Sequence, residues 1–133
     1  MTKRITPEEV LEAYEATGLK PCNGVWITDA HDKHGIPFVI RACPLTVVAI
    51  HNGLEVSVIR EFIRNIHQSG NPIYDKLKTL GITPEYFYEF YQTIDEGYDG
   101  GDGQAGQDAR DVIKALNKAA LVNWAAYAVD GTP

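Results

Sequence analysis

The chain has 133 residues, of which 44% are hydrophobic and 23% are charged. These values are ordinary for a globular protein and exclude fibrous and disordered classes, and the length predicts a single globular domain, residues 1–133. The formal net charge is −6 and the basic residues are scattered, which argues against a nucleic-acid partner because counterion release needs a concentrated positive surface.

Neither secretion nor membrane insertion is predicted by any segment. The first nine residues contain no apolar run after the basic pair Lys3-Arg4. The most apolar stretch, residues 119–129, is too short to span a bilayer and contains Asn123. We therefore expect a cytoplasmic protein without membrane contact, whose two cysteines are reduced thiols.

The chain opens with a predicted helix followed by a hairpin. Thr6-Pro7-Glu8-Glu9 is a capping box with proline at the first helical position, and Gly18 marks the end of this N-terminal helix. Two β-rich runs, residues 25–28 and 38–40, flank a polar segment and predict a β-hairpin over residues 25–40.

Arg41-Ala42-Cys43-Pro44-Leu45 marks a junction between strand and helix. Proline suits the first helical position, so Cys43 is the expected N-cap of a helix over residues 44–51 that stops at Asn52-Gly53. The positive end of a helix dipole favours a thiolate, which makes Cys43 the candidate catalytic residue. A buried, helix-capping cysteine is the favoured alternative, because no histidine is placed by the sequence as its base.

Cys22, His31, His34 and Cys43 have a spacing that suggests a metal site. In the predicted hairpin both cysteines lie at the base and both histidines at the tip, roughly 20 Å away. Zinc needs its ligands within about 2.3 Å, so we expect no metal site. The facing cysteines are expected to pack as small apolar side chains. A disulfide between them is an alternative only in an oxidising setting.

Three more helices are predicted downstream, over residues 55–68, 72–80 and 84–96, from helical apolar spacing and from Asn-Pro and Thr-Pro-Glu starts. The third of these carries Tyr86 and Tyr88 outside its expected buried stripe. A glycine-rich acidic loop follows, residues 95–108. Its calcium-hand register fails because Gly106 stands where a bidentate carboxylate is needed, so a loop that ends with Asp108 as a helix cap is favoured and weak cation binding stays open.

The last predicted helix, residues 109–129, is apolar on nearly every side towards its C-terminal end. Such a helix is buried all round, either in the middle of its own domain or against another chain, and the pattern leaves both open. In the second case these residues form a homodimer interface: Leu121, Val122, Trp124, Ala125 and Ala128.

Together these elements predict an α+β domain, mainly helical, with five to six helices, the last four or five within residues 44–129, and one small β-hairpin. With its Arg41-Ala42-Cys43-Pro44-Leu45 junction, Leu80-Gly81-Ile82 and Tyr98-Asp99-Gly100, the chain resembles small uncharacterised bacterial proteins with a Cys-x-Leu helix start and a Phe-Asp-Gly-like segment. The resemblance implies a bacterial cytoplasmic setting and no known activity. The chain departs from it with Tyr98 in place of phenylalanine and with a glycine-rich insertion after Asp99.

The leading functional hypothesis is a non-enzymatic binding or regulatory module without a cofactor that self-associates through its C-terminal helix. One alternative is a small thiol-dependent enzyme or redox protein that uses Cys43. Another is a small-molecule-binding protein whose pocket is lined by Trp26, Tyr86 and Tyr88, because ligand pockets favour aromatic side chains.

Overall fold

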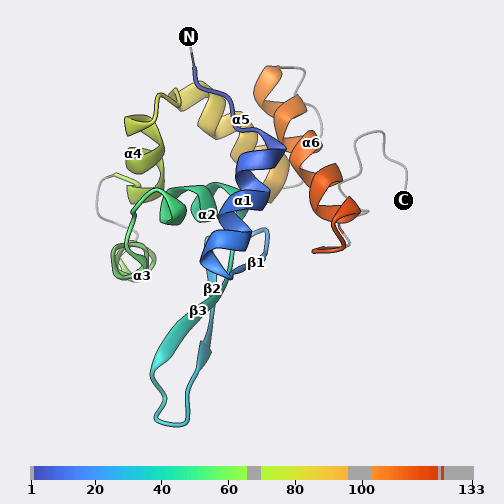
Figure 1. Ribbon diagram of the computed structural model, residues 1–133. Helices are drawn as coiled ribbons and strands as arrows, with labels where there is room; N and C mark the ends of the chain where they lie inside the picture. The colour runs from blue at the N-terminus through green and yellow to red at the C-terminus, as the bar shows by residue number, and fades with distance from the viewer. Residues whose placement is uncertain (1, 66–69, 96–102, 123, 125–133) are drawn as a thin grey trace.

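The computed structural model describes residues 2–65, 70–95, 103–122 and 124 (Figure 1). Within these residues it has six helices and a three-stranded sheet, which confirms the predicted α+β, mainly helical class. The elements in chain order are α1 (Pro7–Thr17), β1 (Lys20–Pro21), β2 (Ile27–His31), β3 (Pro37–Ala42), α2 (Pro44–His51), α3 (Val56–Arg64), α4 (Pro72–Thr79), α5 (Pro84–Asp95) and α6 (Gln104–Lys118).

Several helix ends follow the local sequence signals. The Thr6 hydroxyl accepts a hydrogen bond from the Glu9 backbone N–H at 3.2 Å, and the Glu9 carboxylate accepts one from the Thr6 N–H at 2.9 Å, so the capping box is formed. Gly18 ends α1 in the left-handed conformation, with φ 73°. Asn71 caps α4 by accepting from the backbone N–H of Ile73 at 2.9 Å.

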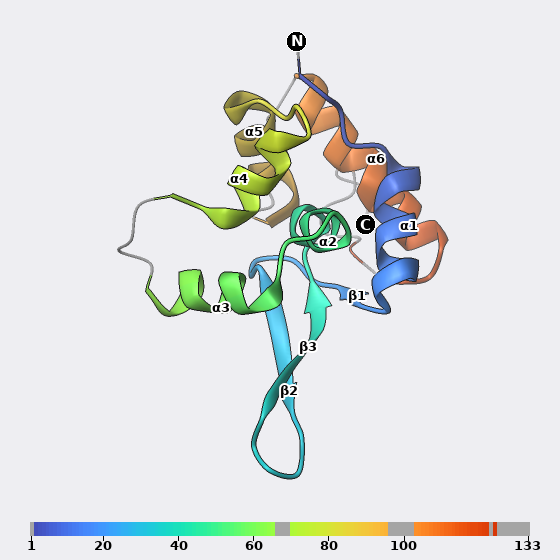
Figure 2. The same cartoon turned by 60° about the vertical axis from the view of Figure 1, so that its left-hand side comes forward.

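The sheet consists of the predicted hairpin and one short added strand. Strand order is β1-β3-β2, with β2 antiparallel to β3 and β1 parallel to it. The pairing of β2 with β3 is irregular between Thr28 and Asp29. We call residues 27–42 the arm, because both views show this hairpin extending away from the helices (Figures 1 and 2).

Helix α2 is the centre of the hydrophobic core. Every residue from Pro44 to Ala49 is buried, so this helix is covered on all sides, as its apolar sequence requires. It lies between α1 and α4 in both views (Figures 1 and 2). In contrast, α3 buries Ile59 alone among its residues, and the predicted extension of that helix to residue 68 falls partly on residues 66–69, outside the described part of the chain.

The last helix differs from the prediction at both ends. Asp108 does not cap it, because α6 begins at Gln104 with Gly103 as N-cap. The cap is supplied by α5, where the Glu89 carboxylate accepts from the backbone N–H groups of Gly103 and Gly106, each at 3.2 Å. A Cβ on Gly103 would lie 2.6 Å from a Glu89 carboxylate oxygen, so glycine leaves room for this contact.

The predicted helix over residues 119–122 is wrong, because α6 ends at Lys118. Ala120 adopts φ 60°, and its N–H donates to the Asn117 carbonyl at 3.0 Å while the Leu121 N–H donates to the Leu116 carbonyl at 3.0 Å. This is a Schellman motif with alanine where glycine is usual, which explains why the sequence pattern did not show the helix end. Residues 123 and 125–133 lie outside the described part. Within the described ranges, no helix is both long and apolar enough to cross a membrane.

Candidate functional site

One surface feature of the helical part is a stripe on α5. Pro84, Phe87, Tyr88 and Tyr91 recur at i, i+3, i+4 and i+7, so they share one face of the helix. Phe87 lies near the core, whereas Tyr88 is 63% exposed. The stripe therefore runs from the core to the surface.

Two apolar pockets lie along this stripe. The α4-side pocket, of about 270 Å³, is lined by Asn71, Tyr74, Pro84, Phe87 and Tyr88. The hairpin-side pocket, of about 240 Å³, is lined by Gly24, Val25, Trp26, Ile27, Ile63 and Tyr91. Helices α3, α4 and α5 and the base of the arm thus all contribute walls.

Packed aromatic rings, two pairs stacked and one edge-to-face, connect the two pockets. The ring centroids of Trp26 and Tyr91 are 4.9 Å apart, those of Phe87 and Tyr91 are 6.5 Å apart, and those of Tyr74 and Phe87 are 5.2 Å apart. These separations are typical of favourable aromatic pairs. We call the two pockets and the rings between them the α5 groove.

An ion pair holds α3 against the arm beside the hairpin-side pocket. The Arg60 guanidinium donates to both carboxylate oxygens of Asp29, with Nη2–Oδ1 at 2.7 Å and Nε–Oδ2 at 3.1 Å. The hydrogen bonds from Arg60 hold the pKa of Asp29 below its ordinary value. Asp29 follows the irregular step in the β2–β3 pairing, and such bulges commonly redirect a side chain.

The structure separates the three residues predicted to line a ligand pocket. Trp26 lines the hairpin-side pocket and Tyr88 the α4-side pocket, whereas Tyr86 lines neither. Tyr86 is buried, in contrast to the expectation that it lies outside the buried face of its helix. Its hydroxyl donates to Asp108 Oδ2 at 2.6 Å and accepts from the Ile5 N–H at 2.7 Å.

Asp108 is the centre of a polar cluster in which Asp108 and Tyr86 are buried and Arg4 is 58% exposed. Besides Tyr86, the Arg4 guanidinium donates to both of its oxygens at 2.9 and 3.1 Å, and Gln104 Nε2 donates at 2.8 Å. Burial raises the pKa of Asp108, but these hydrogen bonds together outweigh burial and hold it below its ordinary value. Burial and the bond to Asp108 raise the pKa of Tyr86. The cluster fixes the N-terminal segment to α5 and α6, and its polar atoms are used within the protein.

Cys43 is the N-cap of α2, as predicted. Its side chain is fully buried, and Sγ lies 3.1 Å from the Thr46 hydroxyl. Cys43 lines none of the three pockets described here. A nucleophile must be reached by its substrate, so these three pockets do not support the catalytic role of Cys43, which stays a prediction.

The cysteines and histidines whose spacing suggested a metal site are spread along the arm. His31 pairs with Pro37 at the far end, while the Cys22 N–H donates to the Ala42 carbonyl at the base, and both cysteines are thiols. Among the described residues, no group of three or more His, Cys, Asp or Glu is placed to hold a metal ion. The predicted weak cation site falls largely on residues 96–102, outside the described ranges.

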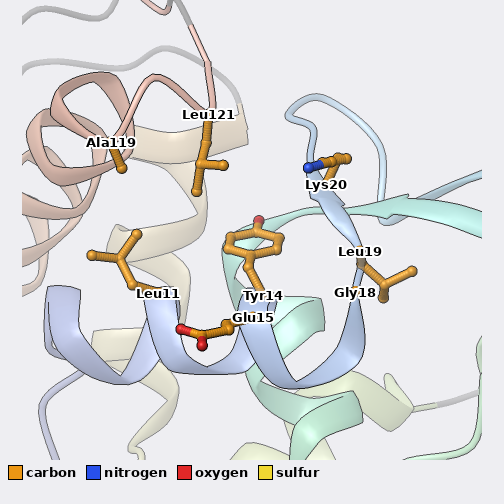
Figure 3. Close-up of a pocket in the computed structure, with 8 residues that line it drawn as sticks. All are labelled: Leu11, Tyr14, Glu15, Gly18, Leu19, Lys20, Ala119 and Leu121. Carbon is orange, nitrogen blue, oxygen red and sulfur yellow. The ribbon is translucent and has the colours of Figure 1, made fainter.

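A third pocket, of about 410 Å³, lies beside α1 (Figure 3). Leu121 points from the segment after α6 towards Leu11 and Tyr14 on α1, and Lys20 of β1 also lines the pocket. The Tyr14 hydroxyl is engaged with the Ala42 carbonyl at 2.7 Å. Of the predicted interface residues, Leu121, Val122 and Trp124 are half-buried against their own core, and Ala125 and Ala128 lie outside the described residues.

The groove was only partly visible in the sequence. A stripe that starts at Pro84 and continues through Phe87, Tyr88 and Tyr91 at helical spacing would have identified the groove floor. Ile63 and Tyr74 come from other helices and carry no local signal for this site. In comparisons with known proteins, no family model, curated protein or solved structure matches the chain.

Proposed function

We propose that this protein is a non-catalytic binding module whose α5 groove holds apolar side chains of another polypeptide. The observation that carries the proposal is that one helical stripe lines two apolar pockets, of about 240 and 270 Å³, joined by stacked aromatic rings. Each pocket is below the roughly 300–1,000 Å³ usual for a small-molecule site. Pockets that take one large side chain of a partner are typical of interface hot spots.

The chemistry of the lining supports binding rather than catalysis. The lining residues of both pockets are aromatic, aliphatic, glycine, proline and Asn71, without histidine, cysteine, lysine or a carboxylate. General acid–base catalysis near neutral pH uses such titratable groups. Aromatic side chains are enriched at protein interfaces, and rings already packed on one another lose little conformational freedom on binding.

Three further expectations belong to this proposal. The resemblance described above implies a bacterial cytoplasmic setting, and the scattered basic residues argue against a nucleic-acid partner. Self-association through Leu121, Val122 and Trp124 stays a prediction as well. That segment follows the end of α6 and is not a helical face at Leu121 and Val122.

A matched pair of variants on α3 tests the groove. Ile63 lines the hairpin-side pocket and is 41% exposed, whereas Val58 lies on the same helix, is 43% exposed and lines neither pocket. Random-peptide phage libraries are selected on the immobilised wild-type chain, and the selected peptides are then measured on Ile63→Asp and Val58→Asp. We expect binding to survive in Val58→Asp and to weaken at least about tenfold in Ile63→Asp. Equal binding to both variants would overturn the proposal.

A further inference from the structure

The tip of the arm carries apolar side chains that the helical core does not cover. Ile36 is 59% exposed and Phe38 is 48% exposed, and every residue from 31 to 38 is exposed. A two-stranded hairpin is marginally stable when it stands alone in water. The end of the arm thus presents apolar surface without the packing that normally accompanies it.

The two side chains form a small projecting pair. Ile36 directly precedes β3 and Phe38 is the second residue of that strand, so the two exposed side chains lie two positions apart at the tip. Phe87 and Tyr91, one from each pocket lining, have ring centroids 6.5 Å apart, so the two pockets are neighbours. Two side chains that are two positions apart in sequence are close enough to enter neighbouring pockets.

The exposed apolar side chains of the described residues divide into a concave and a convex set. Val25, Ile63 and Tyr88 line the pockets of the groove, Ile36 and Phe38 form the tip of the arm, and Val58 belongs to neither set. A self-complementary interface of this kind requires both surfaces on one chain, because the convex surface of each copy binds the concave surface of the other.

We propose that the polypeptide in the α5 groove is the arm of a second copy of this chain, with Ile36 and Phe38 seated in the two pockets. This inference rests on the proposed function of the groove. The exchange is reciprocal, so each copy gives its arm and receives the arm of its partner about a two-fold axis.

The position of the groove allows such an exchange. One wall of the hairpin-side pocket is formed by Val25, Trp26 and Ile27 at the base of the arm. Two arms that lie side by side in opposite directions bring each tip to the base of the other. The contact therefore closes on itself at two copies, and no free surface is left to extend it into a fibre. The Asp29–Arg60 ion pair fixes the base of the arm against α3, which limits the ordering cost on association.

Sedimentation velocity on the 133-residue chain at micromolar concentration tests the exchange. We expect a dimer for the wild type and for Val58→Asp, and at least an approximately tenfold higher dimer dissociation constant for Phe38→Asp and Ile63→Asp. Circular dichroism checks that the variants are folded. If Phe38→Asp and Ile63→Asp dimerise like the wild type, the inference is wrong, and loss of the dimer only in Leu121→Asp would assign association to the C-terminal segment.

Mixing the two defective variants separates an arm-in-groove contact from other contacts. The Ile63→Asp copy has an intact tip and the Phe38→Asp copy an intact groove, so a mixed dimer retains one of its two contacts. We expect differently labelled chains of the two variants to form a mixed dimer more tightly than either variant dimerises alone. A mixture as monomeric as its components contradicts the exchange.

The inference and the proposed function can fail separately. A wild-type chain that stays monomeric throughout the concentration range overturns the exchange. If selected peptides still distinguish Ile63→Asp from Val58→Asp in that case, the groove binds another polypeptide and only its assignment to a second copy is wrong.

Discussion

The helical body and the arm use their apolar side chains in opposite ways. In the body, α2 is buried from Pro44 to Ala49, and the polar atoms around Asp108 are satisfied by Arg4, Tyr86 and Gln104. In the arm, residues 31–38 are all exposed, including Ile36 and Phe38. Since burial is the main favourable term in folding, stability depends on the body, while the arm is free to change its contacts with other molecules.

Removing the carboxylate of Asp108 is expected to have a large effect on the stability of the helical body. Asp108→Ala leaves the buried Tyr86 hydroxyl without its acceptor, and an unsatisfied buried polar group costs about 1–3 kcal/mol, whereas Arg4 is 58% exposed and stays solvated. The free energy of unfolding in urea measures the effect. Asp111→Ala is the control on the same helix, because Asp111 is partly exposed and accepts from Gln107; we expect a loss below about 1 kcal/mol. Equal losses would show that the cluster does not stabilise the body.

The same carboxylate makes the body sensitive to acid. The pKa of Asp108 is below its ordinary value in the folded chain, so the charged form stabilises folding above the unfolded pKa of about 3.9. That stabilisation is lost as pH falls from about 5 through the folded pKa. We expect Asp108→Asn to flatten this decline in the free energy of unfolding. Asp29→Asn is expected to change it less, because the side chains of Asp29 and Arg60 are a quarter exposed. A wild-type decline that both variants reproduce would contradict this assignment.

The labelling rates of the two cysteines compare the two regions, because one cysteine lies in the body and the other near the base of the arm. Cys43 is fully buried at the start of α2, and Cys22 is half-buried with Sγ 3.7 Å from the Val25 carbonyl. We expect iodoacetamide to label Cys43 at least about tenfold more slowly than Cys22 at neutral pH, because only the exposed thiolate reacts. Mass spectrometry of Cys22→Ser and Cys43→Ser gives each rate. Rapid labelling of Cys43 that saturates below pH 7 would instead favour the thiol-dependent enzyme.

The fold could largely be predicted from the sequence, because its helix starts carry local chemical signals. Thr6-Pro7-Glu8-Glu9 and Cys43-Pro44 gave correct starts for α1 and α2. The start of α6 could not be predicted, since Glu89 caps it from another helix. β1 was missed because it has only two residues and forms by pairing with a strand about twenty positions later.

The candidate site was less predictable than the fold. Trp26, Tyr86 and Tyr88 were predicted to line one pocket, but Trp26 and Tyr88 line two different pockets and Tyr86 is used inside the body. Whether a tyrosine lines a pocket depends on which helices pack beside it, and that is not encoded near the residue. Ile63 and Tyr74 lie on α3 and α4, so only the packing of those helices reveals their place in the groove.

A substitution at Ala120 tests where α6, and with it the helical body, ends. Ala120 has φ 60°, a conformation that costs an L-residue about 1–2 kcal/mol and glycine little. We expect Ala120→Gly to raise the free energy of unfolding by about 0.5–1 kcal/mol, after the larger entropy of glycine in the unfolded chain is subtracted. Ala115→Gly, inside α6, is the control and should lower it by about 1 kcal/mol. Destabilisation by both substitutions would mean that the helix continues through residue 120.

The smallest expected effect on stability is at the tip of the arm. Phe38 is exposed and no core packing is lost when it is replaced, so Phe38→Ser should change the free energy of unfolding of the monomer by less than about 0.5 kcal/mol. Phe90→Ser, in the fully buried stripe of α5, is the opposite control and should cost about 3–5 kcal/mol. The measurement uses urea denaturation of the Ile63→Asp background, in which association is weakened, so that dimerisation does not add to the measured stability. If Phe38→Ser destabilised this monomer as strongly as a core substitution, the arm would belong to the folding unit and its apolar tip would no longer be available as a surface for a second copy.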